Sequence, residues 1–145
     1  MLLEVVLKKG GIKMADQKSI LLVDDDPSFL DATAIVLEGF GYRTIKALNP
    51  EECFEELKKE LPNLIILDVM MARLDSGFDV CRKLKSDDRT KQIPILMLTA
   101  VDKKYPFDFG SAAGEPDWLP VEDFMDKPVE AMELVEHVRK LLKES

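Results

Sequence analysis

The stretch Leu64-Ile65-Ile66-Leu67-Asp68 places four consecutive apolar residues directly before a single carboxylate. A run this apolar is typical of a strand buried on both faces, as in a parallel sheet covered by helices. In such sheets ligands bind outside the carboxyl ends of the strands, which is where Asp68 would lie. The stretch therefore predicts a buried central strand that presents Asp68 at a functional edge. Taken alone, Asp68 would more often be an ordinary acidic residue at a strand end.

Three further segments end in side chains that would join Asp68 at that edge. They are residues 20–23 before Asp24, Asp25 and Asp26; residues 95–98 before Thr99; and residues 124–128, which contain Lys127. Because the carboxyl ends of parallel strands meet at one edge of a sheet, carboxylates, a hydroxyl and an ammonium would converge there. The pattern therefore predicts a site built from several strands.

The overall composition limits the classes of protein to which the chain can belong. A length of 145 residues is typical of one domain with a substantial core. The net charge of −8 argues against nucleic acid or an anionic membrane as a direct partner, because both would be repelled. Two cysteines are too few for a disulfide framework or a zinc site, and no segment approaches the length of a membrane-spanning helix. We therefore expect a cytoplasmic domain.

Strand-like and helix-like segments alternate from residue 19 onward, which predicts an α/β fold with a parallel sheet. The expected strands are residues 19–23, 42–47, 64–68, 93–99 and 123–126. The expected helices are residues 27–40, 50–61, 77–85 and 129–143. Asp26-Pro27 and Asn49-Pro50 are helix start signals, and the first two apolar stripes extend to Phe40 and Leu61.

The segments outside these elements are irregular. Residues 86–90 are expected to form a solvated turn, and residues 100–123 contain several prolines and glycines that leave little room for a full helix. Residues 19–144 form the predicted domain. Residues 1–18 lack the basic leading region of a secretory signal, so we interpret them as an N-terminal extension, native or not, with no assigned function.

Three converging carboxylates, Asp24, Asp25 and Asp68, would repel each other at the predicted edge. Two such charges about 4 Å apart cost roughly 4 kcal/mol at an effective dielectric constant near 20. A hard divalent cation removes that cost, and ligation by oxygen alone suits Mg²⁺. The alternative is a hydrated acidic rim without an ion. A bound Mg²⁺ would also allow the edge to handle a phosphoryl group.

The remaining polar residues fit phosphoryl chemistry. Lys127 and Thr99 would contact phosphoryl oxygens, one by charge and one by a hydrogen bond. One carboxylate must then be the nucleophile that forms an aspartyl phosphate. We assign this role to Asp68, because it ends the predicted central strand and would face the metal, Thr99 and Lys127 together. Considered singly, Lys127 and Thr99 would be an ordinary surface lysine and an ordinary strand-end threonine.

Together, the four segments around Asp24-Asp25-Asp26-Pro27, Asp68, Thr99-Ala100 and Asp126-Lys127-Pro128 resemble the signatures of response-regulator receiver domains, over about residues 19–143. The resemblance implies a flavodoxin-like, doubly wound, five-stranded parallel sheet in the order 2-1-3-4-5. It also implies a role for each site residue. Asp24 and Asp25 would be the acidic pair, with Asp25 a direct metal ligand; Asp68 would be phosphoacceptor and metal ligand, and the Met70 carbonyl a further Mg²⁺ ligand. Thr99 would be the switch hydroxyl, Lys127 the phosphate-pairing lysine, and Phe124 the aromatic residue of the coupled switch.

The resemblance further implies a function and partners. The chain would be a chemotaxis-regulator-like single-domain receiver, a phosphorylation-dependent switch of a two-component phosphorelay. It would accept its phosphoryl group from a sensor histidine kinase or a histidine phosphotransfer protein and act on an unknown downstream protein. It would catalyse only its own phosphorylation and dephosphorylation, as a monomer or a weak dimer.

Three features depart from the family pattern. Ala72-Arg73 stands where the family usually has Pro-Gly, and one extra residue precedes Gly77. Residues 100–123 are longer than usual, so we expect the fourth helix to be irregular or shortened, with Trp118 more often a buried anchor than a partner contact. Among the other residues, we interpret Cys53 and Cys81 as core residues and His137 as a surface or interface residue.

The sequence is also compatible with two alternative functions. The first is a haloacid-dehalogenase-type phosphatase, in which residues 24–28 form an Asp-x-Asp-x-Ser motif and Asp24 is the nucleophile. That interpretation lacks a cap insertion and leaves Asp68 without a task. The second is a receiver-shaped interaction module that is never phosphorylated, against which the complete set of site residues argues.

Overall fold

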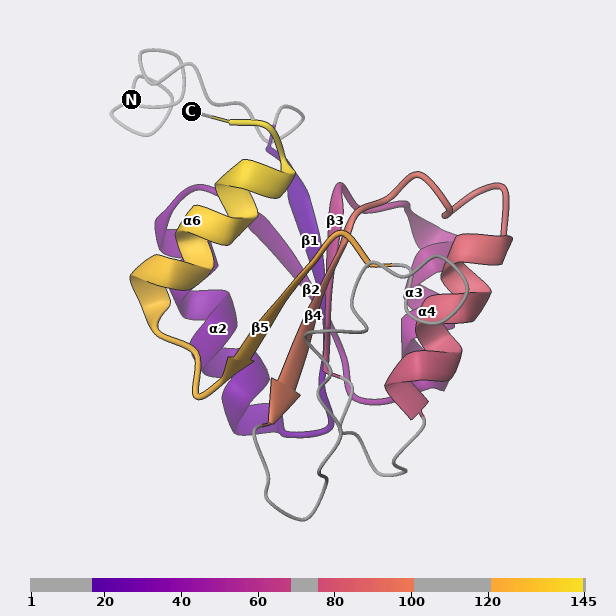
Figure 1. The fold of residues 1–145 in the computed structure, drawn as a ribbon, viewed down its shortest axis with the longest axis horizontal. Helices are drawn as coiled ribbons and strands as arrows, with labels where there is room; N and C mark the ends of the chain where they lie inside the picture. Colours follow the sequence, from indigo (N-terminus) through magenta and orange to yellow (C-terminus); the bar gives the residue numbers. More distant parts are fainter. Residues whose placement is uncertain (1–16, 69–75, 101–120, 145) are drawn as a thin grey trace, which may run out of the picture.

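The structure of this chain is a computed structural model that describes residues 17–68, 76–100 and 121–144. Within these ranges it shows a parallel sheet with helices on both faces (Figure 1). The irregular or shortened helix that we expected within residues 100–123 cannot be compared, because residues 101–120 lie outside the described residues. So do Met70, Trp118 and almost all of the N-terminal extension.

The sheet has five parallel strands in the order β2-β1-β3-β4-β5, as the resemblance implied. The strands are β1 (Ser19–Val23), β2 (Arg43–Ala47), β3 (Leu64–Asp68), β4 (Ile95–Ala100) and β5 (Asp123–Lys127). β1 and β3 have the predicted bounds. β3 lies at the centre of the sheet, so Asp68 ends the middle strand.

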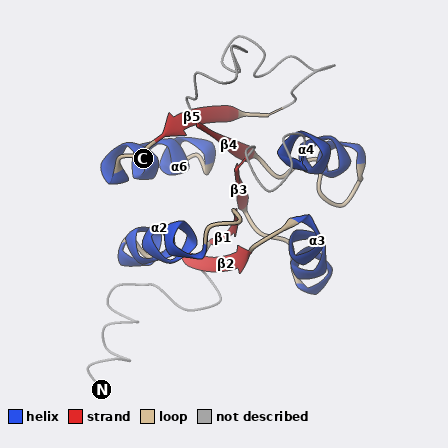
Figure 2. Cartoon of the chain, turned by 90° about the horizontal axis from the view of Figure 1, so that it is seen from below, coloured by secondary structure: helices blue, strands red, loops and turns tan. Residues whose placement is uncertain are grey.

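Four helices of the described chain pack on the sheet in two pairs. They are α2 (Pro27–Gly39), α3 (Pro50–Lys59), α4 (Ser76–Ser86) and α6 (Ala131–Leu141). Seen along the sheet, α2 and α6 lie on one face and α3 and α4 on the other (Figure 2).

The sheet separates the core into two parts, and alternate residues of each central strand enter different parts. In β3, Leu64 and Ile66 pack on the side of α2 and α6, whereas Ile65 and Leu67 pack on the side of α3 and α4. All five residues of β3 are buried. Burial on both faces is the physical reason for the unbroken apolar run that precedes Asp68.

Both predicted helix start signals are confirmed. The Asp26 carboxylate accepts the Ser28 backbone N–H at 3.0 Å at the start of α2. The Asn49 side chain accepts the Glu52 N–H at 2.8 Å at the start of α3. Each side chain satisfies a backbone donor that has no partner within its own helix.

The end of α2 also has a defined structure. Gly41 adopts a φ of 97°, which L side chains rarely tolerate. There the Gly41 N–H donates to the Glu38 carbonyl at 3.0 Å and the Tyr42 N–H donates to the Leu37 carbonyl at 3.2 Å. These two bonds form a Schellman motif, so Gly41 ends the helix.

Three details of the sequence interpretation are wrong. Phe40 and Leu61 do not extend the apolar stripes of their helices, because each lies past its helix end and is more than 40% exposed. The predicted solvated turn contains one buried residue, Thr90, whose hydroxyl donates to the Leu84 carbonyl at 2.6 Å. Thr90 therefore closes the end of α4 rather than facing water.

Candidate functional site

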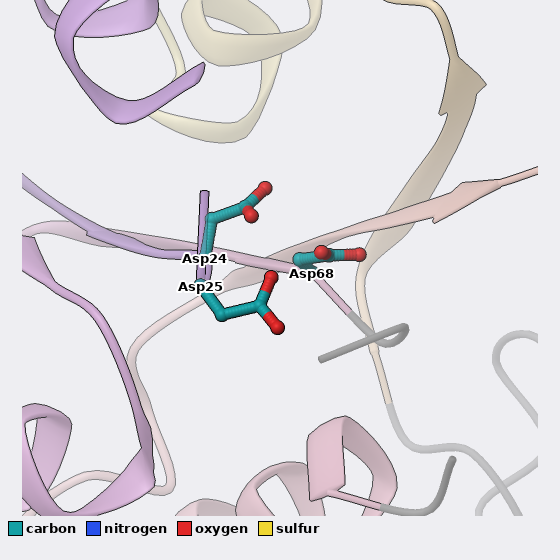
Figure 3. A group of neighbouring side chains, drawn as sticks. All are labelled: Asp24, Asp25 and Asp68. Carbon is teal, nitrogen blue, oxygen red and sulfur yellow. The ribbon is translucent and has the colours of Figure 1, made fainter. Parts of the chain in front are cut away.

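Three carboxylates meet at the carboxyl edge of the sheet. Asp24 and Asp25 follow β1 and Asp68 ends β3, and these neighbouring parallel strands stop at the same level. One carboxylate oxygen of each residue lies within 4.8 Å of the others. The three side chains extend from the two strand ends toward a common region (Figure 3). Asp24 and Asp68 are each 2% exposed, whereas Asp25 is open to solvent.

Lys127, at the end of β5, reaches the same cluster. Its Nζ lies 2.8 Å from Asp24 Oδ2 and 3.4 Å from Asp68 Oδ2. The ammonium also lies 4.2 Å from the centroid of the Phe29 ring on α2, a cation–π contact. Burial lowers the pKa of Lys127, but the hydrogen bond to Asp24 and the charges of Asp68 and Asp24 outweigh it, and the pKa lies above its ordinary value. Lys127 is therefore a fixed positive charge.

The three consecutive aspartates after β1 have different environments. Asp24 Oδ1 accepts the Asp26 backbone N–H at 3.0 Å, while Oδ2 accepts from Lys127. Asp26 uses its own carboxylate to cap α2 and is outside the cluster of acidic ligands. Asp25 is the exposed member. One acidic run thus supplies a buried carboxylate, an open carboxylate and a helix cap.

Thr99 lies at the same edge, near the end of β4, and is 2% exposed. Its hydroxyl donates to Asp126 Oδ1 at 2.9 Å. Asp126 is opposite Thr99 in the register between β4 and β5. The sequence placed Asp126 in one of the family signatures but gave it no role in the site. Its position directly before Lys127, opposite a strand-end threonine, is the signal that would have revealed it.

Phe124 and His137 lie farther from the cluster. Phe124 is half-buried on β5 and packs against the core on the side of α3 and α4. His137 lies on α6, and its Nδ1 is 2.6 Å from Asp123 Oδ2 at the start of β5, the opposite end from Lys127. The sequence did not indicate this partner of His137.

The donor set fits a hard divalent cation. Asp24, Asp25 and Asp68 supply only oxygen ligands, and the exposed Asp25 leaves room for the waters that Mg²⁺ usually retains. Lys127 balances part of the negative charge, yet three carboxylates against one ammonium leave the cluster anionic. The arrangement can hold a cation next to a nucleophilic carboxylate.

Comparison with known proteins defines the class to which this fold and site belong. Residues 20–139 match the family model described as response regulator receiver domain. The chain therefore belongs to the response-regulator receiver family, a signalling module of two-component systems, and the resemblance predicted from its motifs is confirmed. The acidic cluster is typical of the Mg²⁺ site of a receiver.

Individual relatives agree with this assignment. The chain is 38% identical over 128 residues to the DNA-binding dual master transcriptional regulator RpaA of Synechocystis sp., covering 86% of this chain and 48% of that protein. It spans about half the length of the curated relatives it matches. A putative response regulator from Chloroflexus aurantiacus has a TM-score of 0.76 at 32% identity, with 89% of this chain and 100% of that chain covered. A CheY-like receiver domain protein from Methanospirillum hungatei has a TM-score of 0.74 at 25% identity, with 88% and 95% covered.

Proposed function

We propose that this chain is a phosphorylation-dependent switch that accepts a phosphoryl group on Asp68. One observation supports the proposal above the others. A buried carboxylate ends the central strand with Lys127 Nζ at 3.4 Å and the oxygens of Asp24 and Asp25 within 4.8 Å. A nucleophile, a cation-binding pair and a fixed positive charge are the groups that phosphoryl transfer to a carboxylate requires.

In the proposed reaction, a carboxylate oxygen of Asp68 attacks the phosphorus of a phosphohistidine. The P–N bond breaks as the O–P bond forms, and the bond electrons leave with the donor imidazole, which takes up a proton. Lys127 then pairs with a phosphoryl oxygen, exchanging its contact with Asp68 for one with the transferred group. Thr99 donates its hydroxyl hydrogen to another phosphoryl oxygen.

The metal site of the proposal consists of Asp24, Asp25, Asp68 and the Met70 carbonyl. Bound there, Mg²⁺ would neutralise charge on the phosphoryl oxygens. Asp24 is held by the Asp26 N–H and by Lys127, so it serves as a ligand and not as the attacking group. This arrangement disfavours the phosphatase alternative, in which Asp24 would be the nucleophile.

The proposed phosphoryl donor is a sensor histidine kinase or a histidine phosphotransfer protein, in the cytoplasm. We propose that residues 19–144 form the receiver unit, monomeric or weakly dimeric, and that Phe124 couples Thr99 to a downstream protein. Among the described helices, none combines the length and apolar character needed to span a membrane. The net charge of −8 supports a protein partner for this domain over direct contact with nucleic acid.

The test is labelling with acetyl phosphate in the presence of Mg²⁺. The wild-type protein should take up about one phosphoryl group per chain, and Asp68→Asn should take up none. Asp88→Asn is a matched control, because this carboxylate is 93% exposed and pairs only with Lys91 on the surface of the described chain. Labelling that persists in Asp68→Asn would refute the assignment. Multiple-turnover hydrolysis of a phosphate ester would instead support a phosphatase.

A further inference from the structure

The hydroxyl of Thr99 already has an acceptor in the structure, and that acceptor is not Asp68. Thr99 Oγ1 donates to Asp126 Oδ1 at 2.9 Å across the β4–β5 register. Thr99 is 2% exposed, whereas Asp126 is exposed, so the contact joins a buried hydroxyl to a carboxylate that also meets water. The acceptor is a carboxylate, and hydrogen bonds to ionised acceptors are stronger than those between neutral groups.

Strand geometry explains why these two side chains meet. Alternate residues of a strand point to opposite faces, so Phe124 and Asp126 share one face of β5. Phe124 packs on the core beside α3 and α4, which places Asp126 on that side too. Lys127 points to the other face, where it contacts Phe29 of α2. Asp126 therefore sits between the switch aromatic and the phosphate-pairing lysine in sequence, but it faces Thr99.

A threonine hydroxyl has one hydrogen to donate. When that hydrogen is directed to Asp126, it cannot also be donated to a phosphoryl oxygen on Asp68. We propose that Asp126 is a positioning residue that holds the Thr99 hydroxyl in the unphosphorylated state and must release it when Asp68 is phosphorylated. This inference rests on the function proposed above and adds to it a residue that sets the free-energy cost of switching.

The consequence follows from linkage between the two states. A contact made only in the unphosphorylated state stabilises that state, and it weakens binding of any ligand that requires the other state. Removing Asp126 should therefore strengthen binding of a phosphoryl mimic at Asp68. The effect should depend on Thr99, because the contact runs through its hydroxyl.

The experiment measures binding of fluoroberyllate with Mg²⁺ by calorimetry in four proteins: wild type, Asp126→Ala, Thr99→Ala and the double variant. We expect Asp126→Ala to bind about tenfold more tightly than wild type, which corresponds to about 1.4 kcal/mol. In the Thr99→Ala background, Asp126→Ala should change the affinity by less than about twofold. Asp126→Asn, whose amide oxygen still accepts but carries no charge, should lie between wild type and Asp126→Ala.

Two results would overturn the positioning role. An unchanged affinity in Asp126→Ala would show that the contact does not oppose switching. A gain of equal size with and without the Thr99 hydroxyl would show that Asp126 acts only through its charge. Urea unfolding midpoints of the same proteins test whether Asp126 has a purely structural role. In that case Asp126→Ala would change the stability of the protein but not its affinity for fluoroberyllate.

Acetyl phosphate labelling of these proteins separates this inference from the proposed function. If wild type and Asp126→Ala are both labelled at Asp68 and their fluoroberyllate affinities are equal, only the role of Asp126 fails. If wild type neither binds fluoroberyllate nor becomes labelled, the phosphoacceptor role of Asp68 fails and the role of Asp126 fails with it.

Discussion

Replacing Asp68 with asparagine should stabilise the protein when no divalent cation is present. The carboxylate oxygens of Asp24, Asp25 and Asp68 lie within 4.8 Å of one another. At an effective dielectric constant of about 20, each of the two repulsions felt by Asp68 is worth about 3.5 kcal/mol. On the same scale, Lys127 at 3.4 Å attracts Asp68 by about 5 kcal/mol.

Among the charges of Asp24, Asp25 and Lys127 alone, the repulsions exceed the attraction by about 2 kcal/mol, and burial of a charged carboxylate adds a further cost. Solvent around Asp25 weakens the repulsion between Asp25 and Asp68, so the expected gain in the free energy of unfolding of Asp68→Asn is about 1–2 kcal/mol. For a domain of this size, that gain corresponds to a rise in Tm of about 3–8 °C. The assay is thermal unfolding in EDTA, followed by circular dichroism.

Mg²⁺ should reduce the difference in stability between Asp68→Asn and the wild-type protein. A cation that binds only the folded state stabilises it by about 2.7 kcal/mol at a hundred times its Kd, and wild type should gain more than Asp68→Asn. Asp88→Asn is again the control; as an exposed pair with Lys91, it should change stability by less than about 0.5 kcal/mol. Lower stability of Asp68→Asn in EDTA, or no response of wild type to Mg²⁺, would show that repulsion among the three carboxylates does not destabilise the metal-free protein.

Three further predictions concern residues away from the cluster. Burial and the hydrogen bond to Glu144 raise the pKa of Tyr42 to about 12, and ultraviolet titration of a variant lacking the other tyrosine should show this value. The free energy of unfolding should fall between pH about 10 and 12, because the phenol ionises near pH 10 in the unfolded protein but stays neutral in the folded one. Burial raises the pKa of the Cys53 thiol to about 12 and that of the Cys81 thiol to about 11. Both thiols should therefore react with a disulfide reagent at least about a hundredfold more slowly in the folded protein than in protein unfolded by urea. Asn49→Ala removes the cap of α3 and should lower the free energy of unfolding by about 1 kcal/mol in urea titrations.

The parts of the fold that could be predicted from the sequence are those fixed by local chemistry. β1 and β3 were predicted with their bounds, because strands buried on both faces must be apolar throughout. Asp26 and Asn49 were predicted as caps, because an unpaired helix N–H needs a nearby acceptor. The order of the strands followed only from the resemblance to a family, because an apolar run does not specify which strands become its neighbours.

What could not be predicted depends on contacts between distant elements. Thr90 looks like a turn residue in sequence, yet it is buried, because its hydroxyl reaches a carbonyl at the end of α4. The partner of His137 depends on how α6 lies over the start of β5. Asp126 could be assigned to Thr99 only once the register between β4 and β5 was known.

The candidate site could likewise be predicted from the sequence only in part. The convergence of Asp24, Asp25 and Asp68 follows from parallel strands ending at one edge, and the structure brings them together. Lys127 joins them through its long side chain. Thr99 reaches the edge, but its hydrogen bond to Asp126 could not be inferred from spacing alone.

The most direct test of the phosphoacceptor assignment locates the phosphoryl group chemically. After reaction with acetyl phosphate and Mg²⁺, borohydride reduction converts an aspartyl phosphate to homoserine, and peptide mass spectrometry identifies its position. We expect homoserine at position 68 and nowhere else. Homoserine at Asp24 or Asp25, or none at all in protein that has taken up phosphate, would contradict it.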